Sequence, residues 1–269
     1  MRGRVIAILS GKGGVGKTTT VANIGVSLAK DFKKQVVAID ANTTSSGLGI
    51  HLGSYSFPKT LRDVLKGTNV WEALYVHPSG LKLLPSATSV ENFDLSAKKL
   101  KKIVDELKEK FDYVLLDCAP TLGQEAIAGM YSADEVIIVT NPEWPSLLEA
   151  KRTLEYAKYL NKKIIGVVLT QVYKNLSEEF LDKLIQIFGV PIIGIIREDK
   201  KVRESIEKRV PTIHLNPSSK ASKGYKAILE FITGEKYPNN NLLNSIKQKL
   251  LSLSAKENNN KEDEKEWYI

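Results

Sequence analysis

The stretch from Ser10 to Thr19, with the sequence SGKGGVGKTT, constrains this 269-residue chain more than any other part of it. It satisfies every fixed position of the pattern G-x-x-x-x-G-K-[ST]. Its four glycines allow backbone conformations that a side chain would forbid, so that successive N–H groups can surround phosphate oxygens. The loop predicts a nucleotide-phosphate site made by Gly11, Lys12, Gly13, Gly14, Val15, Gly16, Lys17, Thr18 and Thr19.

The residues on either side of this loop fit a strand and a helix. Val5 to Leu9 is a short apolar run typical of a buried strand, and the region from Thr18 to Phe32 carries apolar residues at helical spacing. This order places the positive N-terminal end of the helix against the phosphates. Lys17 then supplies a mobile cation for the β- and γ-phosphates, and the Thr18 hydroxyl suits a Mg²⁺ ion.

Apolar, strand-like runs alternate with helical patterns along the rest of the chain. Near-continuous apolar strands separated by helices are typical of a parallel sheet covered on both faces. The sequence therefore predicts an α/β fold with a doubly wound, mostly parallel sheet and helices on both faces. The expected strands are 5–9, 35–40, 81–85, 113–117, 135–140, 163–170 and 191–196, and the expected helices are 18–32, 61–66, 71–75, 95–111, 145–160, 178–188, 202–208 and 218–232.

Two acids and an amide follow directly on predicted strands. Asp40 and Asp117 each close an apolar run, and Asn42 comes two residues after Asp40. Ligands of open α/β sheets bind beyond the carboxyl ends of the strands. We therefore expect these three side chains to surround the phosphates, with Asp117 holding Mg²⁺ or sensing the γ-phosphate.

The composition excludes several classes of protein. A single cysteine, Cys118, excludes an internal disulfide and a cysteine-cluster metal site within one chain. No run approaches the roughly 18 apolar residues that span a bilayer, and the N-terminus lacks the pattern of a secretory signal. We expect a cytoplasmic protein. Its formal net charge of +8 favours anionic partners without choosing between nucleic acid, lipid and nucleotide.

Lys12 gives the loop the form K-G-G-x-G-K-T-T, which resembles the deviant Walker A motif of the MinD/ParA family of ATPases. The resemblance covers about residues 3 to 233. It implies ATP and Mg²⁺ as cofactors and a homodimer that forms on ATP, in which Lys12 reaches the nucleotide of the partner. It further implies catalytic roles for Lys12, Lys17, Asp40 and Asn42, and a metal site of Thr18, Asp40 and Asp117.

The sequence departs from the family pattern at two places. The second switch acid of the family, which orients the attacking water, is replaced by Asn42. Because an amide cannot accept a proton at neutral pH, we expect slow hydrolysis. The family usually holds adenine with an asparagine after the strand G-V-V-L, where this chain has Thr170. The loop Arg197, Glu198 and Asp199 resembles the family's I-P-E-D loop beside the base, with Arg197 in place of proline.

The composition changes from Gly234 onward, so we expect an ATPase domain over 1–233 and a linker over 234–241. An amphipathic helix over 242–255 follows, whose apolar stripe is bordered by lysines as in the membrane-targeting helix of MinD. A helix that docks on its own domain or on a partner is the alternative. Residues 256–269 form a tail that we expect to be disordered. The expected membrane residues are Leu242, Leu243, Ile246, Leu250 and Leu253.

The resemblance implies a MinD-like role in spatial organisation or in positioning the cell-division site, with peripheral binding to an anionic membrane and an activator protein as a partner. The alternative is a ParA-like partition ATPase that binds DNA through basic residues. A third class, small ligases that share the loop, needs a substrate motif that the sequence does not contain. The candidate DNA-binding residues are Lys200, Lys201, Arg203, Lys208, Arg209, Lys220, Lys223 and Lys226.

Overall fold

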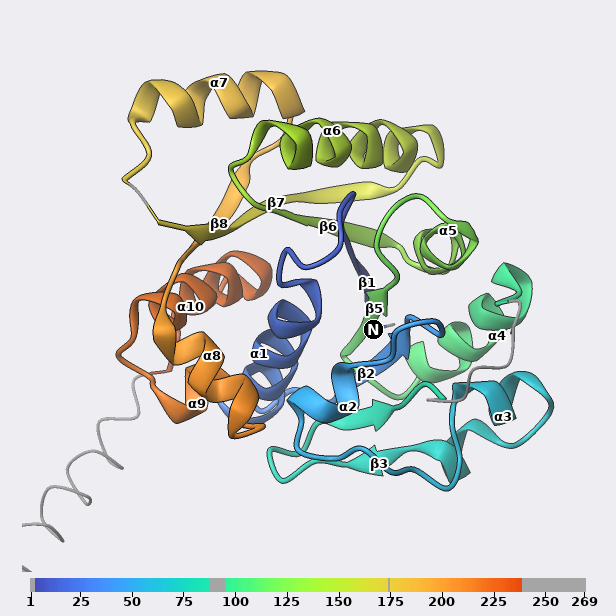
Figure 1. Ribbon diagram of the computed structural model, residues 1–269. Helices are drawn as coiled ribbons and strands as arrows, with labels where there is room; N and C mark the ends of the chain where they lie inside the picture. Colours follow the sequence, from blue (N-terminus) through green and yellow to red (C-terminus); the bar gives the residue numbers. More distant parts are fainter. Residues whose placement is uncertain (1–2, 88–94, 174, 239–269) are drawn as a thin grey trace, which may run out of the picture. The chain divides into compact units, whose positions relative to one another are not determined.

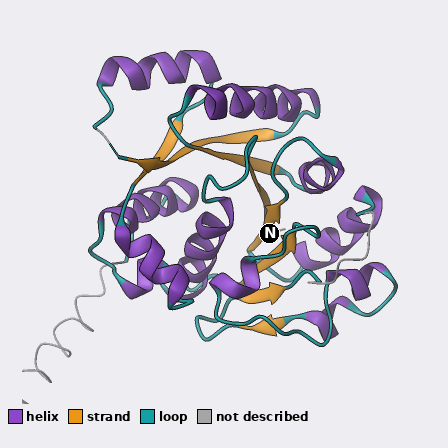
Figure 2. Cartoon of the chain, in the orientation of Figure 1, coloured by secondary structure: helices purple, strands orange, loops and turns teal. Residues whose placement is uncertain are grey.

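A sheet with strand order β3-β4-β2-β5-β1-β6-β7-β8 organises the computed structural model, which describes residues 3–87, 95–173 and 175–238. Every pair of neighbouring strands is parallel except β3 and β4. Figure 1 shows helices on both faces of this sheet, and Figure 2 separates helices from strands by colour. The predicted doubly wound α/β fold is confirmed. The strands are β1 Arg4–Leu9, β2 Val36–Ala41, β3 Tyr75–Val76, β4 Lys82–Leu84, β5 Tyr113–Cys118, β6 Glu135–Thr140, β7 Lys163–Val172 and β8 Ile192–Arg197.

The helices agree with the predicted ranges within a few residues where both exist. Three short ones, α2, α5 and α9, were not predicted. The segment 71–75, expected to be a helix, is instead a 3₁₀ turn followed by β3, because Tyr75 and Val76 pair with β4. The helices are α1 Lys17–Lys30, α2 Leu48–His51, α3 Leu61–Leu65, η1 Val70–Ala73, α4 Ala97–Lys108, α5 Gln124–Ser132, α6 Trp144–Tyr159, α7 Glu178–Phe188, α8 Lys200–Glu207, α9 Thr212–Leu215 and α10 Lys220–Thr233.

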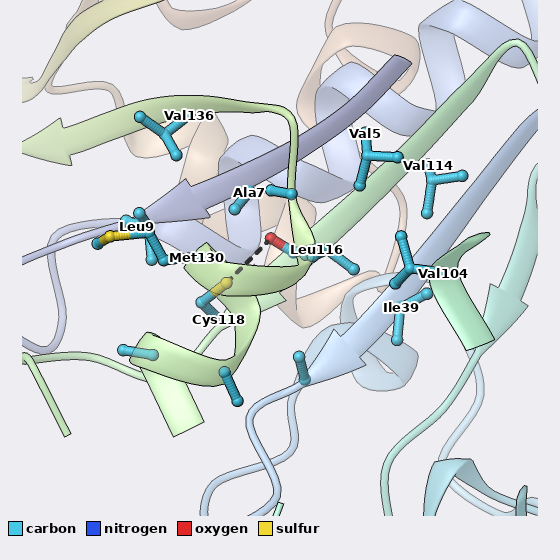
Figure 3. Packing of buried hydrophobic residues seen from close by; sticks show 14 of the residues in the cluster. Val5, Ala7, Leu9, Ile39, Val104, Val114, Leu116, Cys118, Met130 and Val136 are labelled. Atoms are coloured by element: carbon cyan, nitrogen blue, oxygen red, sulfur yellow. Dashed lines mark hydrogen bonds between the residues drawn. The ribbon is translucent and has the colours of Figure 1, made fainter. Parts of the chain in front are cut away.

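Two hydrophobic cores lie on opposite faces of the sheet. Successive side chains of a strand point to opposite faces, and in β1 Val5, Ala7 and Leu9 belong to one core while Ile6 and Ile8 belong to the other. Figure 3 shows the first core, where β1, β2 and β5 meet residues of α4 and α5. The central strands are therefore buried on both faces of the sheet. Functional side chains can reach solvent only where these strands end.

Cys118 closes β5 inside the first core. Its side chain is fully buried and its Sγ donates weakly to the Leu116 carbonyl at 3.7 Å (Figure 3). Burial raises the pKa of this thiol to about 12. A thiol that stays protonated is neither a nucleophile nor a metal ligand, so Cys118 acts as a small core residue.

The compact unit extends to Tyr237 rather than ending at residue 233. The Tyr237 ring meets Phe32 edge-on with centroids 5.5 Å apart, and the Tyr237 hydroxyl donates to Asp31 at the end of α1. Residues 234–237 are thus part of the folded domain. The linker beyond residue 238, the amphipathic helix with its five membrane residues, and the tail lie outside the described residues.

Within the described part of the chain, none of the helices combines the length and apolar character that crossing a membrane requires.

Candidate functional site

The phosphate loop connects the end of β1 to the start of α1 at the carboxyl edge of the sheet (Figure 1). Gly14 and Gly16 adopt φ values of 77° and 82°, in the left-handed region that a side chain disfavours. Gly16 is the N-cap of α1, and its carbonyl accepts the first helical hydrogen bond from the Thr20 N–H at 2.9 Å. The first turn of α1 thus faces the loop with unpaired N–H groups, as anion binding requires.

Gly11 lies against α6 with no room for a side chain. An ideal Cβ built on Gly11 would be 2.5 Å from the backbone carbonyl carbon of Glu149. Any other residue here would displace either the loop or the helix. The first glycine of the motif therefore serves packing between the loop and α6, whereas Gly14 and Gly16 serve the turn itself.

Lys17 forms a buried ion pair with Asp117 at the end of β5. The Lys17 Nζ and the Asp117 Oδ1 are 3.1 Å apart, and the two side chains are 7% and 1% exposed. The other carboxylate oxygen, Asp117 Oδ2, is buried and has no hydrogen-bond partner among the described residues. An unpartnered anionic oxygen beside a phosphate site is a position suited to a cation or to its bound water.

Asp40 lies beside Asp117 on the neighbouring strand, where the two are register partners. Its carboxylate accepts hydrogen bonds from the Ser46 hydroxyl at 3.0 Å and from the N–H groups of Gly47 and Leu48 at 3.1 Å each. Asp40 therefore holds the start of α2 against the sheet. Complete burial, followed by the charge of Asp117, raises the pKa of Asp40 to about 7.

The loop between β2 and α2 is closed by Asn42. Its amide donates to the Ser45 carbonyl at 2.8 Å and accepts from the Ser45 N–H at 3.1 Å. The hydroxyls of Thr43 and Thr44 donate to Glu125 in the first turn of α5. The loop after β2 is thus joined to the start of α5 by a carboxylate that the sequence analysis did not identify. Asn42 lines the phosphate cavity, and its role in positioning water stays a prediction.

Lys12 is placed quite differently from Lys17. Its side chain is 49% exposed, and its Nζ lies 3.2 Å from Glu143 Oε2, on the residue that caps the start of α6. Two cavities adjoin the loop and are described below, and Lys12 lines neither of them. The family's early lysine thus contacts α6 and does not line the phosphate cavity of its own chain.

The phosphate cavity has a volume of about 410 Å³ and contains most of the predicted loop residues. No cluster of three or more His, Cys, Asp or Glu side chains able to hold a metal occurs in the described ranges. Mg²⁺ does not need one, because it commonly binds through phosphates, waters and one or two carboxylates. Thr18 on the cavity wall, with Asp117 and Asp40 in contact with the lining residues Lys17 and Ser46, fits that mode. The lining includes Ser10, Gly13, Gly14, Val15, Gly16, Lys17, Thr18, Thr19, Asn42, Ser45, Ser46, Gly47, His51 and Pro120.

A second cavity of about 480 Å³ adjoins the first, since Gly14, Gly16 and Thr19 line both. It brings together the four predicted base residues, Thr170, Arg197, Glu198 and Asp199. The Thr170 hydroxyl, however, is directed at the carbonyls of Val15 and Thr140, at 2.6 and 3.0 Å. The sequence reading did not identify Asn141, Gln171, Tyr173 and Arg203, which line the same cavity.

Comparison with known proteins agrees with this geometry. Residues 3–170 match the family described as an AAA domain. An uncharacterized ATP-binding protein of Methanocaldococcus jannaschii is 34% identical over 234 residues, which are 86% of this chain and 88% of that protein.

Two solved structures share the fold. The cell division ATPase MinD of Pyrococcus furiosus has a TM-score of 0.80 and 34% identity, covering 86% of this chain and 99% of the other. The septum site-determining protein MinD of Pyrococcus horikoshii, complexed with Mg-ADP, has a TM-score of 0.79 and 31% identity, covering 85% and 95%. With the deviant loop of Lys12 and Lys17 at the edge of a doubly wound sheet, the chain belongs to the MinD/ParA family of phosphate-loop ATPases.

Proposed function

We propose that this protein is a Mg²⁺-dependent ATPase that turns over slowly, dimerises on ATP and acts like MinD in spatial organisation at a membrane surface. The observation that carries the proposal is the contrast between the two loop lysines. Lys17 is buried in its own phosphate site, whereas Lys12 is half exposed and lines neither cavity. A cation that its own site does not use is available to the nucleotide of a second copy.

The residues at the loop account for binding of Mg–ATP. The N–H groups of the loop and of the first turn of α1 face the phosphates, and Lys17 adds a positive charge. In this proposal Thr18 on the cavity wall and the unpartnered Oδ2 of Asp117 hold Mg²⁺ directly or through water. A bound Mg²⁺ neutralises charge on the phosphoryl oxygens during transfer. The Mg-ADP in the Pyrococcus horikoshii relative supports the same pair of cofactors here.

Slow turnover follows from Asn42. Its amide already exchanges two hydrogen bonds with Ser45, and its oxygen also accepts from the Thr44 hydroxyl at 3.3 Å, so it contacts an attacking water through its second N–H. It orients water without removing a proton. In this proposal the rate of hydrolysis sets the lifetime of the ATP-bound dimer, and the protein does not serve to supply the products of hydrolysis.

Dimerisation requires Lys12 to leave Glu143. Both side chains are about half exposed, and ion pairs of this kind contribute only about 0–1 kcal/mol. Triphosphate oxygens carry more charge than one carboxylate, so the exchange favours the partner's nucleotide. Glu143 thus restrains Lys12 weakly in the monomer.

The surface on which the dimer assembles is the membrane in this proposal, through the stripe Leu242 to Leu253. One copy of a short amphipathic segment binds weakly, and two copies in one dimer bind much more tightly through effective concentration. The DNA alternative is less favoured by the ion pairs of α8, because Glu204 contacts both Lys201 and Lys208 and reduces their net charge.

The test measures mass and surface binding with ATP and with ADP. By light scattering, the wild-type protein should double its mass with ATP only, and Lys12→Ala should bind ATP yet stay monomeric. Sedimentation with anionic vesicles and with random duplex DNA then separates the surfaces. Doubling of mass by Lys12→Ala contradicts the role of Lys12 in the dimer, and a wild-type mass that does not change with ATP contradicts the dimer. ATP-dependent binding to DNA without binding to vesicles contradicts the membrane role.

A further inference from the structure

Gln171 occupies an unusual backbone position at the end of β7. Its φ is 54°, in the left-handed region, although it lies within a strand. The pairing of β7 with β8 shifts register between Leu169 and Val172, so the two residues between them form a bulge. Bulges re-aim side chains and recur beside active sites. Here the bulge leaves Gln171 exposed on the wall of the second cavity, while Thr170 and Val172 on either side are buried.

The orientation of the Gln171 amide is fixed by the phosphate loop. Its Nε2 donates to the Gly14 carbonyl at 2.9 Å. A carbonyl oxygen only accepts hydrogen bonds, so the NH₂ end of the amide must face the loop. Consequently the Oε1 end faces the other way.

Asn141, at the end of β6, reinforces the same orientation. Its Nδ2 donates to Gln171 Oε1 at 3.3 Å. Asn141 is 7% exposed, and its own Oδ1 is buried without a partner in the part of the chain that the structure describes. A buried unpartnered acceptor is unfavourable. Asn141 is thus held with its NH₂ group toward Gln171, although this orientation leaves its own Oδ1 without a hydrogen bond.

These contacts form a chain of hydrogen bonds, here called the relay, in which Asn141 donates to Gln171 and Gln171 donates to the Gly14 carbonyl. Each of the two side-chain amides has only one orientation that satisfies the relay. A carboxamide oxygen has two lone pairs, of which Asn141 uses one. The other makes Gln171 an acceptor on the wall of a cavity that shares Gly14, Gly16 and Thr19 with the phosphate cavity. A nucleotide whose phosphates lie in the loop extends its base toward this wall.

We propose that Gln171 is the base-selecting residue, and that its Oε1 accepts a hydrogen bond from the 6-amino group of adenine. The proposal rests on ATP binding and names the residue that distinguishes ATP from 6-oxo purine nucleotides. A carbonyl at the same position of the base would face Oε1 oxygen to oxygen. Asn141 is a positioning residue, since it acts by holding Gln171.

Thr170, the residue that the family pattern places at the base, is occupied elsewhere. Its hydroxyl lies 2.6 Å from the Val15 carbonyl and 3.0 Å from the Thr140 carbonyl, and the side chain is 3% exposed. A hydroxyl has one hydrogen to donate, and these carbonyls engage it, while burial of the side chain leaves its acceptor lone pairs little access to a base in the cavity. Recognition of the base is therefore assigned to Gln171, the next residue along the chain.

The test compares the dissociation constants of ATP and ITP, because inosine carries a carbonyl where adenosine carries the amino group. The wild-type protein should prefer ATP by about tenfold, the size of one hydrogen bond of this kind. Gln171→Met keeps the shape of the side chain without its amide, and it should bring the ITP-to-ATP ratio close to one. Gln186→Met, an exposed glutamine of α7, is the matched control and should keep the wild-type ratio.

Asn141→Leu tests the positioning role. It should lower the ratio by less than Gln171→Met does, and the double variant should match Gln171→Met alone, because the two residues act through one contact. Additive effects would overturn the relay by placing Asn141 on the base itself. A wild-type ratio near one, or an unchanged ratio in Gln171→Met, would overturn the proposal for Gln171. Failure to bind either nucleotide would instead refute the proposed ATPase function.

Discussion

The buried carboxyl of Asp40 makes the stability of the nucleotide-free protein depend on pH. Burial and the neighbouring Asp117 raise its pKa from the usual 3.8 to about 7. Between these two values the unfolded chain has an ionised Asp40 while the folded chain still holds the proton. Folding therefore takes up a proton in this range, and stability falls as pH rises from about 4 to about 7.

The size of the effect follows from the shift. Each unit of pKa difference corresponds to about 1.36 kcal/mol, so Asp40 contributes a loss of about 4 kcal/mol over its whole titration, from below pH 4 to above pH 7. Roughly 2.5 kcal/mol of this total falls between pH 5 and pH 8, where the protein is easiest to handle. Asp40→Asn mimics the protonated side chain at every pH and should remove this component. Urea denaturation of both proteins without nucleotide, at intervals from pH 5 to pH 8, gives the difference between their pH profiles.

Parallel profiles for the two proteins would refute the reasoning, since the shift would then be absent. The absolute stability of Asp40→Asn does not decide the matter, because an amide accepts fewer of the hydrogen bonds from Ser46, Gly47 and Leu48. A second readout uses ligand binding. Mg–ATP should favour the ionised carboxyl and release protons near pH 6.5, which calorimetry in buffers of different ionisation enthalpy detects.

Three further outcomes are expected. Glu143→Gln removes the carboxylate that holds Lys12 and should strengthen the ATP-dependent dimer by up to about fivefold, the equivalent of about 1 kcal/mol; sedimentation equilibrium that finds a weaker dimer would contradict this. Asn42→Asp should raise the steady-state rate of phosphate release by about 10- to 10³-fold, since a carboxylate polarises water more strongly than an amide; an unchanged rate excludes Asn42 as the water-positioning residue. Truncation after Pro238 should abolish sedimentation with anionic vesicles while ATP affinity stays constant; a truncated protein that still sediments would place the membrane contact in the folded domain.

The position of the phosphate loop between a strand and a helix was predictable because its determinants are local. Gly14 and Gly16 need positive φ within one loop, and the strand and helix that flank the loop are continuous in the sequence. Asp40 and Asp117 were predictable for a related reason. Each ends an apolar strand, and parallel strands bring such ends together at one edge, where the two are register partners.

The contacts that the sequence did not predict join residues far apart in the chain. Glu143 lies 131 positions from Lys12, and Glu125 lies about 80 positions from the threonines that it accepts from. Each contact depends on how one helix end is set against one loop. No periodicity in the sequence records such a placement, and the residue types alone read as ordinary surface charges.

The short helix α2 shows a different limit. Its four residues carry too little pattern to predict a helix, and no side chain of its own N-cap, Gly47, supports it. The helix forms because Asp40, seven residues before Gly47, accepts hydrogen bonds from its first N–H groups. The sequence indicated Asp40 as a ligand of the phosphate site and did not reveal that it caps a helix.

The end of β7 links the phosphate loop to the base cavity through the planes of two peptide bonds. In a trans peptide the C=O and the following N–H point in opposite directions. Gln171 holds the Gly14 carbonyl and Thr170 holds the Val15 carbonyl. The N–H groups of Val15 and Gly16 must then point away from β7, and both residues line the phosphate cavity. The strand that carries the base-reading side chain therefore also sets the direction of two phosphate-binding donors. For this reason the effect of Gln171→Met has to be read from the ratio of ITP to ATP affinity. Weaker binding of both nucleotides alike would report only the loss of loop orientation.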